Sequence, residues 1–462
     1  MRNNTGSAGQ GRLARSRRLT GAVAAGLLFC APPARAGGIP SGAIPLGAIP
    51  LGAIPLGAIP VDNIPLGAIP VDDIPLGATV DGLLAKARRL SPDLAARALN
   101  AAAADAGARA AGYLPDPTLR VTQDEIDVLG GARRPKQIYA IEQEVPLWGK
   151  LGLRVASARA QANAVREEGR AANAELTEQI AIAFAQYWVA HRALAVLEGL
   201  HGIRRGIVAA AESRYAQGRG AQVDVLRADA ALTRQQTEIA RFAAQKRAAQ
   251  GVLNVLLLRD PTAPLADPRQ LRALPAEAAL APAALIARAA NPRVAAAKSR
   301  VAAADANRRL AHREWYPNVT LSIGAIDRHG YGPNGYTAAV SLRVPLQWGL
   351  RDALTDQAGA ELRAAEAMRD AAAQDVARAI AEAAATLTGA RESERLTRDR
   401  LLPQLDAAVR SAVANYGNGR TELTPVLDAV RELGEARLSL LALQLDEQRQ
   451  LAAIERLIGG SP

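Results

Sequence analysis

The strongest constraint on the fold of this 462-residue chain is an internal repeat of about 200 residues. Four motifs occur in the same order in both halves: YLPDPTL at 113–119 and WYPNVTL at 315–321, VPLWG at 145–149 and VPLQWG at 344–349, RYAQG at 214–218 and NYGNG at 415–419, VLRA at 225–228 and VLDA at 426–429. A shared order at near-constant spacing is typical of a duplicated structural unit. We therefore expect two similar halves, residues 79–280 and 281–462.

Both halves are predicted to contain the same elements. A first helix is expected at about 80–112 and again at about 282–313, each followed by two strands with a turn-rich loop between them (130–135 and 329–335). A long helix, a glycine-containing break and a second long helix complete each half. In the first half these helices span 150–213 and 222–259.

The predicted helices are typical of a long helical bundle. The chain is rich in Ala and Leu and only 3% aromatic, and each long helix would exceed about 50 Å at roughly 1.5 Å per residue. Apolar residues recur every three or four positions, which is typical of coiled-coil-like packing. These positions are Leu176, Ile180, Phe184, Tyr187, His191, Leu194 and Leu197 in the first half, and Leu402, Leu405, Val409, Val413 and Tyr416 in the second.

The strands alternate between apolar and small polar residues. In Asn318–Asp327, one face carries Val319, Leu321, Ile323 and Ala325, and residues 336–346 alternate in the same way. The alternation is less regular in the first half. Residues 139–147 alternate, but in 119–128 the apolar positions shift from one face of the strand to the other. About ten residues of period-two alternation are long enough to cross a bilayer at a tilt. A soluble four-stranded sheet with one polar face is the alternative.

Three of the four tryptophans, Trp148, Trp315 and Trp348, lie at strand ends and predict an aromatic belt at a membrane interface. Four strands cannot close a barrel, and an open sheet edge is not tolerated in lipid. If the strands span a membrane, several chains must pool them, and three chains would supply twelve.

The N-terminus carries an export signal. Four arginines between positions 12 and 18 precede an apolar run from Gly21 to Ala31, and the sequence Ala-Arg-Ala ends at Ala36. This order predicts a secretory signal peptide at 1–36. Cys30, the only cysteine, could mark a lipoprotein site, but the bulky Phe29 disfavours it, and Arg17-Arg18 hints weakly at twin-arginine export.

A low-complexity segment follows at 37–78, where Ile-Pro occurs eight times, usually within Ile-Pro-Leu-Gly-Ala. Proline at every fifth residue excludes a continuous helix, so an extended tail is expected. Such a tail is either a tether or a repeat that is tolerated because it hangs free.

Composition and motifs argue against an enzyme or a nucleic-acid-binding protein. The net charge is +11, but Arg is interleaved with Glu and Asp along the chain, as on solvated helices. The four histidines (191, 201, 312 and 329) have no metal-ligand spacing, and neither Gly-x-Gly follows a strand. We therefore expect no catalytic residues, cofactor or bound metal.

The motifs EVPLWGKL at 144–151, YAQG at 215–218 with DVL at 224–226, and YGNG at 416–419 with VLDA at 426–429 resemble the TolC family of outer-membrane efflux proteins. The resemblance covers about residues 80–460. It implies a mainly α-helical homotrimer in which each chain adds four strands to a shared twelve-stranded barrel and its helices to a periplasmic tunnel. It also implies a periplasmic adaptor and an inner-membrane pump as partners, and a Gram-negative outer membrane as location.

In this family the two glycine-containing breaks are hairpin turns at the periplasmic tip, where the adaptor docks and the channel closes. The resemblance implies a hydrogen bond between Asp224 and Tyr416 in the closed state. Pro425 and Arg227 depart from the family's acidic pattern, which leaves cation selectivity open. The tip residues carried over are Tyr215, Gly218, Asp224, Arg227, Tyr416, Gly419 and Asp428.

The substrate is open between metal cations, small toxic compounds and, less strongly, proteins. The PLWGKL stretch looks like that of members serving cation efflux, although a chain that lacks the signal has no cysteine and one methionine, Met368. The rival interpretation is a periplasmic coiled-coil scaffold or adaptor without a channel.

Overall fold

The computed structural model describes residues 76–124, 136–282, 285–286, 290–329 and 332–460. The chain divides into two units, residues 1–69 and 70–462, and all described residues belong to the second. The predicted signal peptide, most of the Ile-Pro segment and the loop at 130–135 lie outside the described residues. Residues 76–78, which we assigned to the free tail, are packed: the Ala266 amide donates to the Leu76 carbonyl (2.9 Å) and Ala78 is buried.

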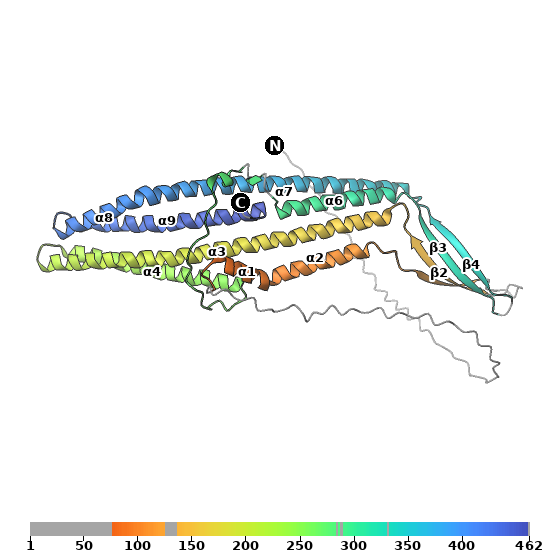
Figure 1. Ribbon diagram of the computed structural model, residues 1–462, viewed down its shortest axis with the longest axis horizontal. Helices are drawn as coiled ribbons and strands as arrows, with labels where there is room; N and C mark the ends of the chain where they lie inside the picture. The colour runs from red at the N-terminus through yellow and green to blue at the C-terminus, as the bar shows by residue number, and fades with distance from the viewer. Residues whose placement is uncertain (1–75, 125–135, 283–284, 287–289, 330–331, 461–462) are drawn as a thin grey trace, which may run out of the picture. The chain divides into compact units, whose positions relative to one another are not determined.

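The two halves repeat the same succession of elements (Figure 1). The first contains α1 (Val80–Leu90), α2 (Pro92–Ala110), β1 (Thr118–Asp124), β2 (Lys136–Val145), α3 (Lys150–Ala216) and α4 (Gln222–Leu256). A short 3₁₀ turn, η1 (Glu277–Leu280), precedes the second, which contains α6 (Pro292–Arg313), β3 (Asn318–Asp327), β4 (Gly335–Arg343), α7 (Trp348–Leu396), the π-helical turn η2 (Thr397–Leu401), α8 (Leu402–Gly417) and α9 (Leu423–Ile458).

Prolines account for the places where the helices and strands differ from expectation. The predicted helix at 80–112 is two helices, because Pro92 disfavours helical ψ at Ser91, whose ψ is 116° and whose hydroxyl caps the Leu94 amide. The helix expected at 282–313 is also interrupted: residues 282 and 285–286 are helical, and α6 begins at Pro292 behind the Asn291 cap. The strand expected to reach 346 ends at Arg343, two residues before Pro345, which has no amide to donate.

The π turn η2 was not predicted. It comes directly before Leu402 and Pro403, where a proline inside a helix loses one amide donor and crowds the carbonyl four residues earlier. The chain nevertheless continues as one helical rod from α7 into α8.

Helices α2, α3, α6 and α7 lie side by side in that order, and their strands form one antiparallel sheet in the order β1-β2-β3-β4 (Figure 1). The α3–α4 and α8–α9 turns lie at the opposite end of the helices from the sheet. By length and composition one stretch of α3 is apolar enough to cross a membrane, but 56% of that stretch is buried against other helices. We therefore regard it as a core segment.

The apolar core lies between the helices. One cluster contains Leu83, Ile180, Phe184, Tyr187 and Leu253, and a second near the hairpin turns contains Leu200, Val409, Tyr416, Val426 and Val430. Most of the predicted helix-packing positions fall in these clusters. Val413 is an exception, because 38% of it is exposed.

Candidate functional site

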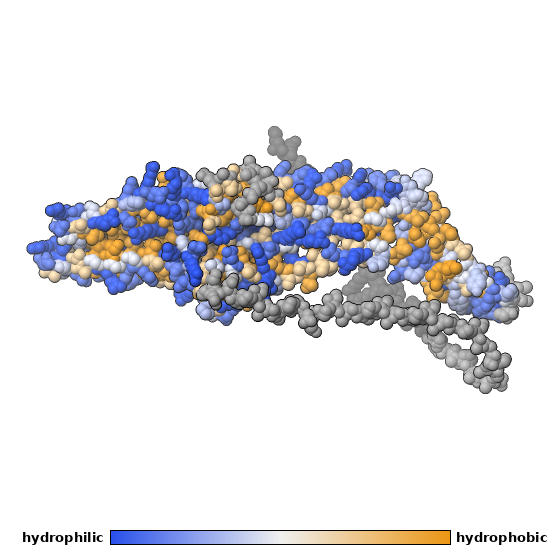
Figure 2. All heavy atoms as spheres, in the orientation of Figure 1, coloured by the Kyte–Doolittle hydropathy of each residue, from blue (hydrophilic) through white to orange (hydrophobic). Residues whose placement is uncertain are grey.

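One face of the sheet is apolar and exposed. The strand register aligns Leu119, Ile141, Ile323 and Ala338 in one row across all four strands. A second row contains Val121, Tyr139, Ala325 and Tyr336. Most large side chains on this face are 43–90% exposed, for example Ile323 at 67% and Val340 at 68%. Figure 2 shows hydrophobic residues gathered where the strands join the helices.

The first-half strand is therefore in phase from Leu119 to Thr122. Leu119 and Val121 share the apolar face, and the alternation stops at Gln123, which pairs with Gln137. The phase slip noted in the sequence begins there, at the end of β1.

The opposite face of the sheet is mostly polar, with Ile138 and Ile326 side by side near the end away from the helices. Arg120 forms an ion pair with Glu142 at 2.8 Å, and Thr320, Ser322 and Gly324 follow one another along the same face of β3. A Cβ atom on Gly324 would lie 2.6 Å from the Tyr139 carbonyl oxygen, so only glycine allows β2 to approach β3 this closely. Strands β1 and β4 are the two edges of the sheet.

A buried lysine joins the polar face to the helices. Lys150, the first residue of α3, is 1% exposed. Its Nζ donates to the Tyr316 carbonyl (2.8 Å) and Asn318 Oδ1 (2.7 Å) and lies 3.4 Å from Glu314 Oε2. Asn318 in turn donates to Glu144 Oε1 at 2.9 Å. This network connects the α6–β3 corner to the β2–α3 corner.

The three tryptophans of the predicted belt all lie at this junction. Trp148 has φ of +63°, donates from Nε1 to the Pro317 carbonyl (3.0 Å) and packs against Tyr316, with ring centroids 5.2 Å apart. Trp315 is half-buried, and Trp348, the first residue of α7, is 65% exposed. The corners at the two motifs therefore differ. In VPLWG the tryptophan precedes the helix and has a positive φ, whereas in VPLQWG, which has one more residue, the tryptophan is the first residue of α7.

The two hairpin tips have the same backbone geometry. Gly218 and Gly419 have φ of +68° and +72°. The Gly218 amide donates to the Tyr215 carbonyl (2.9 Å), and the next amide donates to the carbonyl five residues earlier (2.9 Å). Gly419 and Tyr416 repeat this arrangement at 3.0 Å and 2.9 Å. Each tip is a Schellman motif, which requires a left-handed residue at the glycine position.

An arginine connects the two tips. Arg214 Nη1 donates to the Tyr416 carbonyl (2.9 Å), and its guanidinium lies 4.6 Å from the centroid of the Tyr416 ring. Within the described residues no hydrogen bond joins Asp224 to Tyr416. Burial raises the pKa of the Tyr416 hydroxyl, Arg214 partly opposes this, and the nearby Asp224 carboxylate adds to it.

The other tip residues lie at the surface. Tyr215 is 49% exposed, and Asp428 pairs with Arg431 at 3.6 Å. Arg227 donates to Thr424 Oγ1 at 3.3 Å, which forms a second contact between the two hairpins.

A groove of about 760 Å³ lies between α4 and α9 behind the tips. Five arginines and three carboxylates line it: Arg204, Arg227, Arg234, Arg241 and Arg431 with Glu238, Asp428 and Glu435. The lining therefore has an excess of two positive charges. The pKa of Arg204 is lowered by burial and by the neighbouring Arg234.

Sequence reasoning did not identify the roles of Lys150 and Arg214. Lys150 belongs to the EVPLWGKL motif, but a lysine at the start of a helix is ordinarily expected to be exposed to solvent. Arg214 is the first residue of the repeated motif at 214–218, but only the three-dimensional contact with the second half reveals its partner.

The comparisons with known proteins agree with this architecture. The family model for outer membrane efflux protein matches residues 83–257 and 285–460. The cobalt-zinc-cadmium resistance protein CzcC of Cupriavidus metallidurans is 22% identical over 387 residues, which cover 82% of this chain and 90% of CzcC.

Two solved structures show the same fold. CusC, described in relation to transmembrane channel formation, matches with a TM-score of 0.72 at 19% identity, over 83% of this chain and 92% of CusC. The outer membrane protein VceC of Vibrio cholerae matches with a TM-score of 0.72 at 20% identity, over 83% and 96%. Because the family model covers both halves of the duplication, the chain belongs to the outer membrane efflux protein family.

Proposed function

We propose that this outer membrane efflux protein is the exit duct of a tripartite system. Three copies pool their strands into a twelve-stranded barrel and their helices into a periplasmic tunnel. A periplasmic adaptor and an inner-membrane pump deliver the substrate, which crosses the duct passively.

The exposed apolar face of the sheet carries this proposal. All four strands contribute large apolar side chains to one face, while the other face is mostly polar. This distribution is the reverse of a soluble sheet, whose apolar face packs on a core, and it suits a barrel with lipid outside and water inside.

The strand lengths fit a bilayer. Ten residues of β3 extend about 33 Å, which at a tilt of about 40° gives a height of about 25 Å, the height of the apolar band of outer-membrane barrels. The unpaired edges β1 and β4 can be satisfied only by other copies of the chain. Three sheets of four strands support an even-numbered closed barrel.

In this duct the tips act as the gate, and the groove between α4 and α9 receives the adaptor. The Arg214–Tyr416 and Arg227–Thr424 contacts hold the two hairpins of one chain together, and their loss would free the hairpins to separate. The net positive groove suits an adaptor segment that carries carboxylates.

Metal cations are the first substrates to test, because CzcC is named for cobalt, zinc and cadmium resistance. Small toxic compounds come second. A strain without the gene should become sensitive to one class, and the wild-type gene should restore resistance. Unchanged tolerance to both classes would contradict an efflux role.

Neighbouring cysteine substitutions test the orientation of the sheet. In outer-membrane vesicles, Ser322→Cys should react with a water-soluble maleimide and Ile323→Cys should not. A lipid-soluble maleimide should label Ile323→Cys. Equal labelling of both sites by the water-soluble reagent would favour the periplasmic scaffold and refute the barrel.

Charge reversal tests the groove. Arg234→Glu should weaken capture of the adaptor encoded with the same pump, because Arg234 lines the groove and has no carboxylate partner among the described residues. Arg205→Glu is the matched control, since Arg205 is an exposed arginine of α3 outside the groove. Equal loss of capture in both variants would point to general charge and not to the groove.

A further inference from the structure

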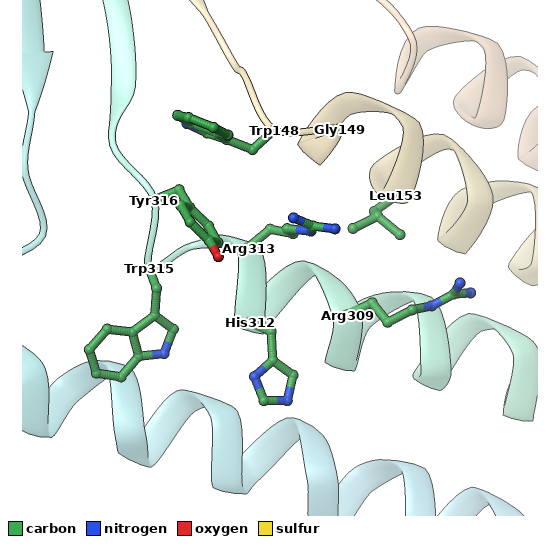
Figure 3. Close-up of a pocket in the computed structure, with 8 residues that line it drawn as sticks. All are labelled: Trp148, Gly149, Leu153, Arg309, His312, Arg313, Trp315 and Tyr316. Atoms are coloured by element: carbon green, nitrogen blue, oxygen red, sulfur yellow. The ribbon is translucent and has the colours of Figure 1, made fainter.

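A second cavity lies at the base of the sheet, between the start of α3 and the end of α6. It measures about 700 Å³ and is lined by Trp148, Gly149, Leu153, Arg309, His312, Arg313, Trp315 and Tyr316. Figure 3 shows Trp148 beside the Tyr316 ring and the Arg313 guanidinium extending between Tyr316 and Leu153. The lining combines three basic side chains with three aromatic ones and contains no carboxylate.

The basic side chains of the cavity lie apart from the ion-pair network of the polar side. On the polar side, the Lys150 network continues down the helices as the pairs Arg154–Glu314, Arg300–Glu168 and Arg293–Glu175. At 100° per residue, Arg309, His312 and Arg313 lie about 140°, 160° and 100° around α6 from Glu314. The basic residues of the cavity therefore project from other faces of α6 than the one that carries these ion pairs.

The cations in the cavity are available to a ligand. Arg309 pairs with Asp305 on its own helix at 2.9 Å, but within the described residues Arg313 has no carboxylate partner. Its guanidinium lies 5.9 Å from the centroid of the Tyr316 ring, a contact that holds the side chain without neutralising it. His312 adds a further polar group that is exposed to solvent.

In the proposed trimer, neighbouring copies of the chain would not cover this cavity. It lies between α3 and α6, the inner two of the four adjacent helices, whereas neighbouring copies would join at the β1 and β4 edges beside α2 and α7. The cavity also lies where the exposed apolar side chains of the strands end. In a membrane that position corresponds to the level of the lipid headgroups.

We infer that this cavity, which we name the basal pocket, binds the phosphate of an anionic phospholipid. Arg313 and Arg309 donate to the phosphate oxygens, Trp148 and Tyr316 contact the glycerol region, and the acyl chains extend along the apolar face of the sheet. The excess of cations disfavours a headgroup that carries a quaternary ammonium. The inference rests on the proposed function, because it requires the sheet to lie in a membrane.

Native mass spectrometry of the delipidated full-length protein tests this inference. The protein in nonionic detergent is mixed with phosphatidylglycerol or phosphatidylcholine, and retained lipids are counted per chain. Wild type should retain more phosphatidylglycerol than phosphatidylcholine, up to one molecule of phosphatidylglycerol per chain. Arg313→Gln should weaken retention by about tenfold, the value of a charge-assisted hydrogen bond. Arg313→Lys should keep most of it.

The control is Lys298→Gln, which removes one exposed positive charge from the same helix about 22 Å further from the sheet. It should retain lipid as wild type does. Glycerol 1-phosphate at the lipid concentration should not compete, and full competition would assign a soluble phosphate ligand and overturn the lipid.

Equal retention of the two lipids by wild type, or equal retention by Arg313→Gln and wild type, would also overturn the inference. The spectrum reports assembly at the same time. A monomer that stays in solution after the detergent is removed would refute the proposed function, whereas a trimer without lipid preference would refute only the basal pocket.

Discussion

Replacing Lys150 by Met removes the buried cation at the junction between sheet and helices. The Nζ donates to two uncharged acceptors, the Tyr316 carbonyl and Asn318 Oδ1, at 2.8 Å and 2.7 Å. Each such bond from a charged donor contributes about 1.5–3 kcal/mol. The third partner, Glu314, keeps Arg154 and Arg351 at 3.7 Å and 3.9 Å, so the loss of that ion pair adds little.

Methionine fills most of the vacated volume and offsets part of this loss. We therefore expect Lys150→Met to lower the free energy of unfolding by about 3 kcal/mol. For a cooperative unit of 150–250 residues this corresponds to a fall in Tm of roughly 6–12 °C. The Asn318–Glu144 hydrogen bond loses its neighbour, so we also expect a lower yield of assembled protein.

Thermal unfolding in detergent, followed by circular dichroism at 222 nm, measures the change. Lys298→Met is the matched control, because Lys298 is exposed on α6 and should shift Tm by less than about 2 °C. If Lys150→Met and Lys298→Met unfold at the same temperature, the buried network does not stabilise the junction and the reasoning is wrong.

Three further predictions concern other parts of the chain. Gly324→Ala should destabilise the sheet by about 1–3 kcal/mol, because its Cβ would press on the Tyr139 carbonyl; wild-type thermal stability would refute the close approach. Burial raises the pKa of Glu447 to about 7, so wild type should lose stability as pH rises from about 4.5 to 7. Glu447→Gln should therefore raise Tm more at pH 8 than at pH 5, and a gain independent of pH would contradict this. Gly218→Ala and Gly419→Ala should each cost about 1 kcal/mol in a urea titration, and a marked inequality would count against equivalent tips.

Much of the fold could be predicted because its signals are local or repeated. The duplication defined two equivalent halves, and the alternation in 318–327 identified a strand with one apolar face. The break at Pro92 was also visible in the sequence, since proline disfavours helix at the preceding residue.

The contacts between the halves could not be predicted in the same way. The resemblance implied an Asp224–Tyr416 hydrogen bond, but in this chain Arg214 occupies the Tyr416 carbonyl and ring. The burial of Lys150 depends on the corner built by residues 314–318, which are more than 160 residues away. No periodicity or spacing within one segment reports such a pairing.

The measurement that tests the central claim most directly is the native mass of the full-length protein from separated envelope fractions. The pooled barrel predicts a trimer that is found in the outer-membrane fraction and requires detergent to stay in solution. A monomer that is released without detergent would contradict the channel and favour a periplasmic scaffold.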